Sequence, residues 1–252
     1  MAIYIAAHKK INVFLQKGYV PLHVGKAIAS VDLPYIGDNI GDNISEKNPN
    51  FCELTALYWI WKNQKDETVG LVHYRRFFFK NYISFLKKSY FPFSKANEIL
   101  REYDIILPHK TVMLKRNVYS NYKESHRIED LEVCGRIILK LYPEYYNAFK
   151  EILKTHKYYA FNMFITRRNI FEEYMQWLFS IINEIEMQIS VENLDKYNQR
   201  VFGFLAERLF NVWIKKNNNL KIKELPVFNT EQNQMIQFIQ GIEDLMKRIV
   251  LK

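Results

Sequence analysis

Three basic side chains follow a short apolar run of the sequence. Residues 69–72 (VGLV) read as a buried strand, and His73, Arg75 and Arg76 stand where this strand would leave the sheet. Ligands of open α/β sheets bind beyond the carboxyl ends of the strands, and arginine binds a diphosphate through paired hydrogen bonds. We therefore expect at least one of the three to contact a ligand. The alternative is that one arginine faces solvent or a structural carboxylate.

A similar polar exit follows the first apolar run, residues 2–7, where His8 and Lys9 stand. Parallel strands end at the same edge of a sheet. If residues 2–7 and 69–72 form parallel neighbours, His8 and Lys9 share a cleft with the basic side chains that follow residue 72.

The stretch GDNIGDNIS, residues 37–45, repeats Gly-Asp-Asn in a chain with only 8 glycines. Glycine allows positive φ, Asp and Asn can bind sugar hydroxyls, and the start of a helix near residue 49 would present unpaired N–H groups. The alternative is a double turn in which Asp and Asn bond their own backbone. We predict that this loop forms a wall of the ligand site. Its candidate residues are Asp38, Asn39, Asp42 and Asn43.

One face of a predicted helix, residues 197–216, carries Arg200, Gly203 and Glu207 at positions i, i+3 and i+7. Glycine inside a helix costs about 1 kcal/mol relative to alanine, so a close approach is expected there. This face suits a ligand site. A surface helix in which Glu207 pairs with a neighbouring arginine would give the same pattern.

The elements that position these side chains alternate along the chain. Apolar runs predict strands at residues 2–7, 69–72, 103–107, 158–166 and 220–228. Helical spacing predicts a helix that begins at residues 48–50 with an Asn cap and ends near 63, and helices at 127–141, 144–154, 169–188 and 197–216. This alternation indicates one α/β domain, residues 1–230, with a mostly parallel sheet flanked by helices.

The last segment, residues 231–252, is expected to form an amphipathic helix that packs on this domain. Its apolar positions are Met235, Phe238, Ile239, Ile242, Leu245, Met246 and Ile249. The alternative is that this stripe contacts a membrane surface or a partner.

Composition limits the classes of function. The apolar fraction of 48% excludes a disordered chain, and the net charge of +9 favours anionic partners such as phosphorylated metabolites, nucleic acid or a membrane. Aromatic residues interleave with lysine over residues 80–95, but no DNA- or RNA-binding motif is present. Cys52 and Cys134 have no metal or redox spacing, which indicates a reducing compartment, the cytoplasm. The sequence predicts neither a signal peptide nor a membrane span.

Several common catalytic motifs are missing from the sequence. There is no Asp-x-Asp at a strand end, no His, Cys and Asp cluster with metal-ligand spacing, no Gly-x-Ser-x-Gly and no Gly-x-Gly-x-x-Gly. A bound diphosphate would then be neutralised by Arg, Lys, His and backbone N–H groups. We expect no metal ligands and a metal-independent reaction, with Mn²⁺ or Mg²⁺ left open.

Six stretches of the chain, taken together and in order, carry a family resemblance. They are IYIAAHK (3–9), GDNIGDNISEKNPNFCELTALYWIWKN (37–63), GLVHYRRFF (70–78), YDIILP (103–108), FNMFI (161–165) and QRVFGFLAERL (199–209). Over residue 2 to about residue 216 the chain resembles a bacterial family of capsular and exopolysaccharide biosynthesis proteins. That family was long known as a domain of unknown function and is generally described as glycosyltransferases.

The resemblance implies a glycosyltransferase with a Rossmann-like, nucleotide-sugar-binding fold of the glycosyltransferase-A type. It implies transfer of a hexose, galactose-type first, from a nucleotide-diphosphate sugar such as a UDP-sugar. The acceptor would be a lipid-linked glycan that grows into capsule, exopolysaccharide or lipopolysaccharide. The reaction would take place at the cytoplasmic face of the inner membrane, with which the basic protein would make a peripheral contact. FNMFI is similar to the strand with which some galactosyl- and glucosyltransferases line their donor site. The alternatives are a non-catalytic subunit of a polysaccharide assembly and a nucleic-acid-binding protein.

Carried onto this sequence, the family pattern points to two sets of residues. The substrate-binding candidates are His8, Lys9, Asn39, Asn43, Arg75, Arg76, Asn162 and Arg200, and the catalytic candidates are Asp38, Asp42, His73 and Glu207. An inverting transfer needs a base for the acceptor hydroxyl, usually a carboxylate, which favours Asp38, Asp42 or Glu207. A retaining transfer depends more on stabilising the departing diphosphate, which favours the basic residues at 73, 75 and 76.

Overall fold

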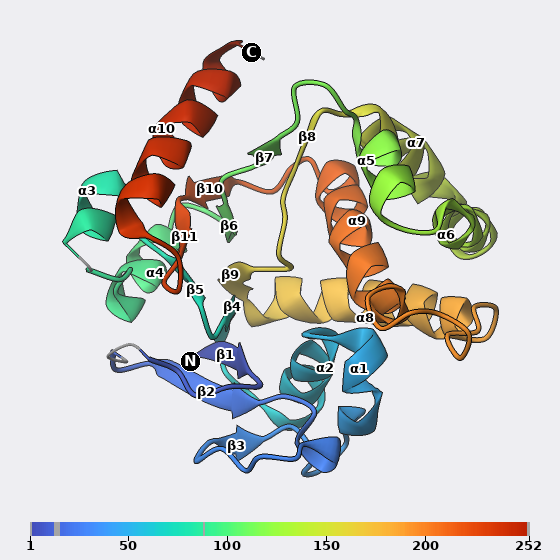
Figure 1. Cartoon of the computed structure of the whole chain (residues 1–252), viewed down its shortest axis with the longest axis horizontal. Coiled ribbons are helices and arrows are strands. Elements are labelled where there is room, and N and C mark those ends of the chain that lie inside the picture. The colour runs from blue at the N-terminus through green and yellow to red at the C-terminus, as the bar shows by residue number, and fades with distance from the viewer. Residues whose placement is uncertain (1, 13–15, 88, 251–252) are drawn as a thin grey trace.

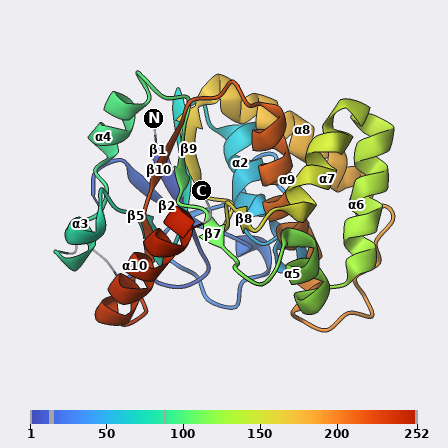
Figure 2. The ribbon, with the colours of Figure 1, turned by 90° about the horizontal axis from the view of Figure 1, so that it is seen from above.

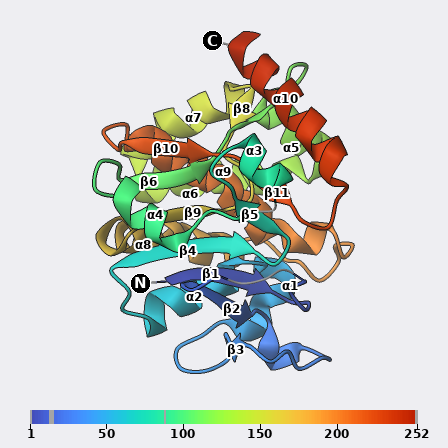
Figure 3. The ribbon, with the colours of Figure 1, turned by 90° about the vertical axis from the view of Figure 1, so that its left-hand side faces the viewer.

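The computed structural model describes residues 2–12, 16–87 and 89–250, and within these residues a mixed sheet of nine strands forms the centre of the molecule (Figure 1). Its main path, visible in Figure 3, runs β10 (Ile222–Leu225), β6 (Ile105–Pro108), β9 (Phe164–Arg167), β4 (Thr68–His73), β1 (Ala2–Ala7), β2 (Tyr19–His23) and β3 (Ile36–Gly37). Off this path, β5 (Arg76–Phe78) pairs with β4 and with β11 (Val227–Asn229). A separate small sheet joins β7 (Thr111–Val112) to β8 (Lys157–Tyr158).

The two strands that carry polar exits are parallel neighbours. In β1 and β4, Ile5 lies opposite Val72 and Ala6 opposite His73, so both strands end at the same edge of the sheet. β2 and β3 continue the parallel order beyond β1, and β6 and β10 form a second parallel pair. β9 is antiparallel to both β4 and β6, which makes the sheet mixed. The expected α/β fold with a mostly parallel sheet is confirmed.

Two of the predicted strands are interrupted. Residues 158–166 form the end of β8, a turn at Phe161 and Asn162, and then β9; both turn residues have positive φ, 77° and 49°, which a continuous strand does not allow. Residues 220–228 divide into β10 and β11 around Pro226, which has no N–H to donate to a ladder. The sequence did not indicate β2 and β3, because β2 contains Pro21 and β3 has only two residues.

The helix predicted from residues 48–50 to 63 is also broken. α1 (Asn48–Phe51) ends at Cys52, whose φ of 53° is incompatible with a helix, and α2 (Leu54–Asn63) follows Glu53. The expected asparagine caps are absent, since neither helix has a side-chain cap bond.

The remaining predicted helices are confirmed, with small shifts at their ends. They are α6 (Ile128–Leu141), α7 (Tyr146–Lys154), α8 (Arg168–Glu186) and α9 (Val201–Lys216). The structure adds α3 (Tyr82–Leu86), α4 (Phe93–Ile99), α5 (Val118–Ser125) and short 3-10 turns at Lys26–Ile28, Ser45–Lys47, Pro143–Tyr145 and Asn198–Arg200.

Helices cover both faces of the sheet (Figure 2). Successive residues of a strand point to opposite faces. In β1, Tyr4 and Ala6 therefore face the larger buried cluster, formed with α2 and α6–α9, while Ile3 and Ile5 face the smaller cluster, formed with α3 and α4. With both faces buried, the polar groups that follow the strands are left at the edge where β1 and β4 end.

The C-terminal helix α10 (Gln234–Val250) packs through only part of its surface. Phe238 contacts the smaller cluster, and the Gln234 side chain donates to carbonyl groups of α3. Much of the predicted apolar stripe faces outward, because Met235, Ile239 and Met246 are half or more exposed. The side chain of Ile249 lies outside the described residues, and the domain division at residue 230 stays a prediction. No helix in the described part of the chain is long and apolar enough to cross a membrane.

Candidate active site

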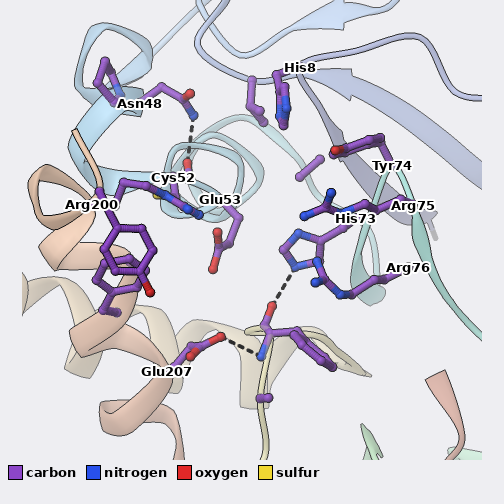
Figure 4. Close-up of a pocket in the computed structure, with 18 of the residues that line it drawn as sticks. His8, Asn48, Cys52, Glu53, His73, Tyr74, Arg75, Arg76, Arg200 and Glu207 are labelled. Carbon is purple, nitrogen blue, oxygen red and sulfur yellow. Dashed lines mark hydrogen bonds between the residues drawn. The ribbon is translucent and has the colours of Figure 1, made fainter. Parts of the chain in front are cut away.

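A cavity of about 790 Å³ lies at the edge where β1 and β4 end (Figure 4). The strand exits form one side, and residues from α1, the segment between α1 and α2, α5 and α9 complete it. The predicted site residues that line it are His8, Lys9, His73, Arg75, Arg76, Arg200 and Glu207. The cleft shared by the two strand exits, which the parallel pairing required, is therefore present.

The strand-exit side of the cavity is basic. Tyr74 N–H donates to Ala6 O at 3.0 Å, which ties the exit of β4 to β1, and the ring of His8 meets the ring of Tyr74 edge-on at 4.8 Å. Arg75 faces Glu231 at 3.6 Å and is partly exposed, as the alternative of a structural carboxylate anticipates. Arg76 lies over the ring of Phe161 at 4.5 Å and has no ion pair among the described residues. Its charge is thus available to an anionic ligand.

His73 is held as a neutral ring. Its Nε2 lies 2.6 Å from Phe161 O, which can only accept a hydrogen bond, so Nε2 carries the ring proton and is the donor. Burial and, to a smaller extent, the charge of Arg76 lower the pKa of His73 to about 4, although the hydrogen bond to Phe161 O acts in the opposite direction. At neutral pH this side chain positions the neighbouring loop and carries no charge of its own.

Two carboxylates face the basic wall. Glu207 accepts from Phe161 N–H at 2.8 Å and pairs with Arg208 at 2.9 Å, so both of its oxygens are engaged. Glu53 accepts from the Asn162 side chain at 2.6 Å. Figure 4 shows Glu53 between Arg200 and the strand-exit basic residues. Burial raises the pKa of both carboxyl groups, although the bond from Asn162 and the charge of Arg208 work against this.

Backbone strain is concentrated at this cavity. The non-glycine residues with positive φ in the described chain are Cys52, Phe161 and Asn162, and all of them adjoin the two carboxylates. Such conformations cost on the order of 1–3 kcal/mol each and persist where surrounding contacts impose them, frequently at functional sites. The turn at Cys52 presents Glu53 to the cavity, and the turn at 161–162 presents one N–H to Glu207 and one amide to Glu53.

The glycine inside α9 allows this arrangement. A Cβ at Gly203 would lie 3.2 Å from Cys52 Sγ, closer than side chains normally pack, so glycine lets α9 approach the strained turn. Arg200 Nε–H donates to the same sulfur at 3.2 Å. Burial raises the pKa of the Cys52 thiol to about 11, which leaves it protonated and unreactive.

The loop of the repeated Gly-Asp-Asn does not reach the cavity. Asp38 is fully buried and accepts from Gly25 N–H at 2.9 Å, from Lys26 N–H at 3.1 Å and from the Ser45 hydroxyl. Asp42 accepts from the Tyr58 hydroxyl at 3.0 Å on the surface. The structure thus gives the loop the double-turn role in place of a wall of the ligand site.

The other predicted residues of the loop also lie outside the cavity. The Asn43 side chain donates to Gly41 O and accepts from Ser45 N–H, which are bonds internal to the turn, and neither Asn39 nor Asn43 lines the cavity. Asn162 is also absent from the lining: it is almost fully buried behind Glu53 and acts through that carboxylate.

Sequence reasoning missed several lining residues. Glu53 lies inside the helix predicted from residues 48–50 to 63 and was given no role in the site, and no helix was predicted at α5. The cavity includes His126, Tyr158, Tyr197, Phe204 and Arg208. A possible signal was the position of Glu53 within the longest stretch of family resemblance. In the described ranges, no group of three or more His, Cys, Asp or Glu side chains is placed to hold a metal ion.

Comparison with known proteins identifies the family. A family model described as a domain of unknown function, DUF4422, matches residues 2–218. The chain belongs to the DUF4422 family. Every residue that lines the cavity falls within the matched range, whereas α10 lies beyond it.

The DUF4422 chain is also similar to a solved structure, the apo form of WbbM, a bifunctional glycosyltransferase. The identity is 35% and the TM-score 0.81, over 92% of this chain and 45% of WbbM, so the chain spans less than half of the length of that protein. No curated protein matches the chain. The resemblance to surface-polysaccharide biosynthesis proteins is confirmed, and the α/β fold is that of a glycosyltransferase structure.

Proposed function

We propose that this DUF4422 protein is a glycosyltransferase that moves a hexose, galactose-type first, from a nucleotide-diphosphate sugar to a growing surface glycan. The observation that carries the proposal is the cavity beyond β1 and β4, in which basic side chains, with Arg76 unpaired among the described residues, face two carboxylates. The 35% identity to a glycosyltransferase supports it. A fold of the glycosyltransferase-A type is part of the proposal.

The basic wall would bind the donor diphosphate. Arg75, Arg76, His8 and Lys9 line one side of the cavity, and Arg76 has no ion pair in the described chain. Guanidinium groups bind diphosphate oxygens with charge-assisted hydrogen bonds. These residues would neutralise the departing UDP, so we propose a reaction that proceeds with a chelator present.

A carboxylate between the two substrates would accept the proton of the acceptor hydroxyl. In an inverting transfer the hydroxyl oxygen forms the new bond to the anomeric carbon, its proton passes to the carboxylate, and the bond from that carbon to the diphosphate oxygen breaks. Glu53 and Glu207, which line the cavity, are our candidates for this role, and burial raises the pKa of both. Asp38 and Asp42 are engaged in turns elsewhere and drop out as candidates.

The acceptor is proposed to be a lipid-linked glycan at the cytoplasmic face of the inner membrane. A net charge of +9 favours an anionic leaflet, and the exposed apolar residues of α10 offer a surface for peripheral contact. A non-catalytic subunit would have no need for the strained turns that present the two carboxylates. Nucleic-acid binding has no support from a sequence motif.

The proposal is tested by titrating UDP-galactose, UDP-glucose and UDP-N-acetylglucosamine into the protein in a calorimeter. Arg76→Ala should weaken the best-bound donor by about tenfold or more, because a charge-assisted bond contributes about 1.5–3 kcal/mol. Arg101→Ala, an exposed arginine outside the cavity, is the matched control and should bind as the wild type does. The proposal fails if the wild type binds none of the three, or if Arg76→Ala binds them equally well.

A further inference from the structure

The two sides of the cavity differ in chemistry. The strand-exit side is mainly basic, whereas the opposite side is built mostly from aromatic rings and uncharged polar groups, with Arg200 beside them and Arg208 paired with Glu207. In Figure 4 Arg200 lies across the cavity from His73, Arg75 and Arg76. The guanidinium of Arg200 lies over the ring of Phe204 at 5.3 Å, so the aromatic residues belong to the Arg200 side. We call this side the aromatic wall; its members are Asn121, Ser125, His126, Tyr158, Tyr197 and Phe204.

The rings of the aromatic wall stack on one another and leave one of them open. His126 stacks on Phe204 with centroids 4.0 Å apart and lies parallel to Tyr197 at 5.5 Å. Tyr197 is 50% exposed and lines the cavity, so half of its surface is not covered by the protein. Its position is fixed by Asp195, whose carboxylate accepts from Tyr197 N–H at 2.9 Å and from Asn198 N–H at 3.1 Å. The wall therefore offers a preformed aromatic surface.

Apart from Arg200, which lies over Phe204, the aromatic wall carries no unpaired charge among the described residues. Burial and the charges of Arg208 and Arg200 lower the pKa of His126 to about 4, so the ring is uncharged at neutral pH. Arg208 is paired with Glu207 at 2.9 Å. His126 Nδ1 is buried and has no hydrogen-bond partner among the described residues. The uncharged polar side chains of the wall, Asn121 and Ser125, also line the cavity.

We propose that the aromatic wall is the acceptor subsite and that it binds a neutral hexoside, the terminal sugar of the acceptor glycan. This inference rests on the proposed function. A hexose ring has an apolar face of C–H groups, which packs on an aromatic ring, and a rim of hydroxyls that need hydrogen-bond partners such as His126 and Asn121. A diphosphate, in contrast, needs the cations of the strand exits.

This placement sets the two substrates on either side of the carboxylates. Glu53 lies between Arg200 and the strand exits in Figure 4, and Glu207 shares α9 with Phe204. A sugar stacked on Tyr197 would direct a hydroxyl toward these carboxylates, and a diphosphate on Arg76 would direct the anomeric carbon toward them from the other side. Reactants held in this way need no further reorientation.

The test uses two probes with the full chain. UDP reports on the strand-exit wall, and octyl β-galactopyranoside, together with its α-anomer and the two glucosides, reports on the aromatic wall. Binding of the glycosides is measured by ligand-detected NMR and binding of UDP by calorimetry. Tyr197→Ala should weaken the best-bound glycoside by roughly five- to tenfold, since it removes the exposed ring surface, and leave UDP affinity unchanged. Tyr119→Ala, a 39% exposed tyrosine outside the cavity, is the matched control.

The outcomes separate this inference from the proposed function. Glycoside binding that persists beside saturating UDP and depends on Tyr197 supports the acceptor subsite. Three results would overturn the acceptor subsite. They are displacement of the glycoside by UDP, equal glycoside affinity of Tyr197→Ala and the wild type, and no glycoside binding to any form of the protein. If UDP fails to bind while the glycoside binds through Tyr197, the donor assignment fails and the aromatic subsite stands.

Discussion

Replacing Asp38 separates a structural role from a catalytic one. The sequence favoured Asp38 as a catalytic residue, whereas the structure buries it completely, with its carboxylate bonded to two backbone N–H groups and to Ser45. These bonds tie the Gly-Asp-Asn loop to the turn at Gly25 and Lys26, next to the end of β2. Asp38→Ala removes the acceptor and leaves three donors without this partner, two in buried bonds and one in a partly buried bond.

The expected cost follows from those three bonds. A hydrogen bond to a charged group contributes about 1.5–3 kcal/mol, and an orphaned buried donor costs a similar amount. Because a water molecule can enter the space left by the carboxylate and restore part of this, we expect a loss of about 3–5 kcal/mol in the free energy of unfolding. For a chain of this size that corresponds to a decrease in Tm on the order of 10 °C.

The assay combines urea unfolding with calorimetric titration of UDP at a temperature where the variant is folded. Asp38→Ala should unfold at lower urea concentration while its folded fraction binds UDP as the wild type does. Asp42→Ala is the matched control: its carboxylate is exposed and, among the described side chains, bonds only to the Tyr58 hydroxyl, so its cost should stay below about 1 kcal/mol. Wild-type stability of Asp38→Ala together with lost UDP binding or lost sugar transfer would refute the structural role.

Three further predictions concern other parts of the molecule. Folding lowers the pKa of His126 from 6.5 to about 4, so between these values the unfolded chain binds more protons than the folded protein. The free energy of unfolding therefore decreases as the pH falls through this range. In urea titrations from pH 7 to 4, His126→Gln should lose less stability than the wild type. The free energy of unfolding of Cys52→Gly should lie within about 1 kcal/mol of the wild-type value, because relief of the positive φ offsets the lost packing. Cys52→Val should lower it by about 1–3 kcal/mol. Equal stability of the two variants in urea unfolding would argue against strain at this turn. Ile236 and Ile239 of α10 are 56% and 51% exposed, and we expect their joint replacement by serine to leave Tm unchanged. The double variant should co-sediment less with anionic phospholipid vesicles than the wild type. Undiminished co-sedimentation would remove α10 as the membrane contact.

The predicted elements show where local pattern is sufficient. β1 and β4 are short apolar runs with polar exits, and α6 to α9 have long apolar stripes. The pattern of apolar residues was therefore sufficient to predict these elements. Once β1 and β4 are parallel neighbours, the rule that strand ends share one edge brings His8, His73 and Arg76 together. The signal failed for strands with a proline or with only two residues, such as β2 and β3.

The sequence by itself determined the class of fold, the helices with long apolar faces, and the basic residues that follow two buried strands, because each depends on neighbours a few positions apart. Only the tertiary structure decided which carboxylates face them. Asp38 was drawn into a turn by N–H groups 12 and 13 residues away, and Glu53 was turned into the cavity by a positive φ at Cys52 that no local preference indicates. That conformation persists because α9 approaches at Gly203 and Asn162, 109 residues along the chain, holds the carboxylate in place.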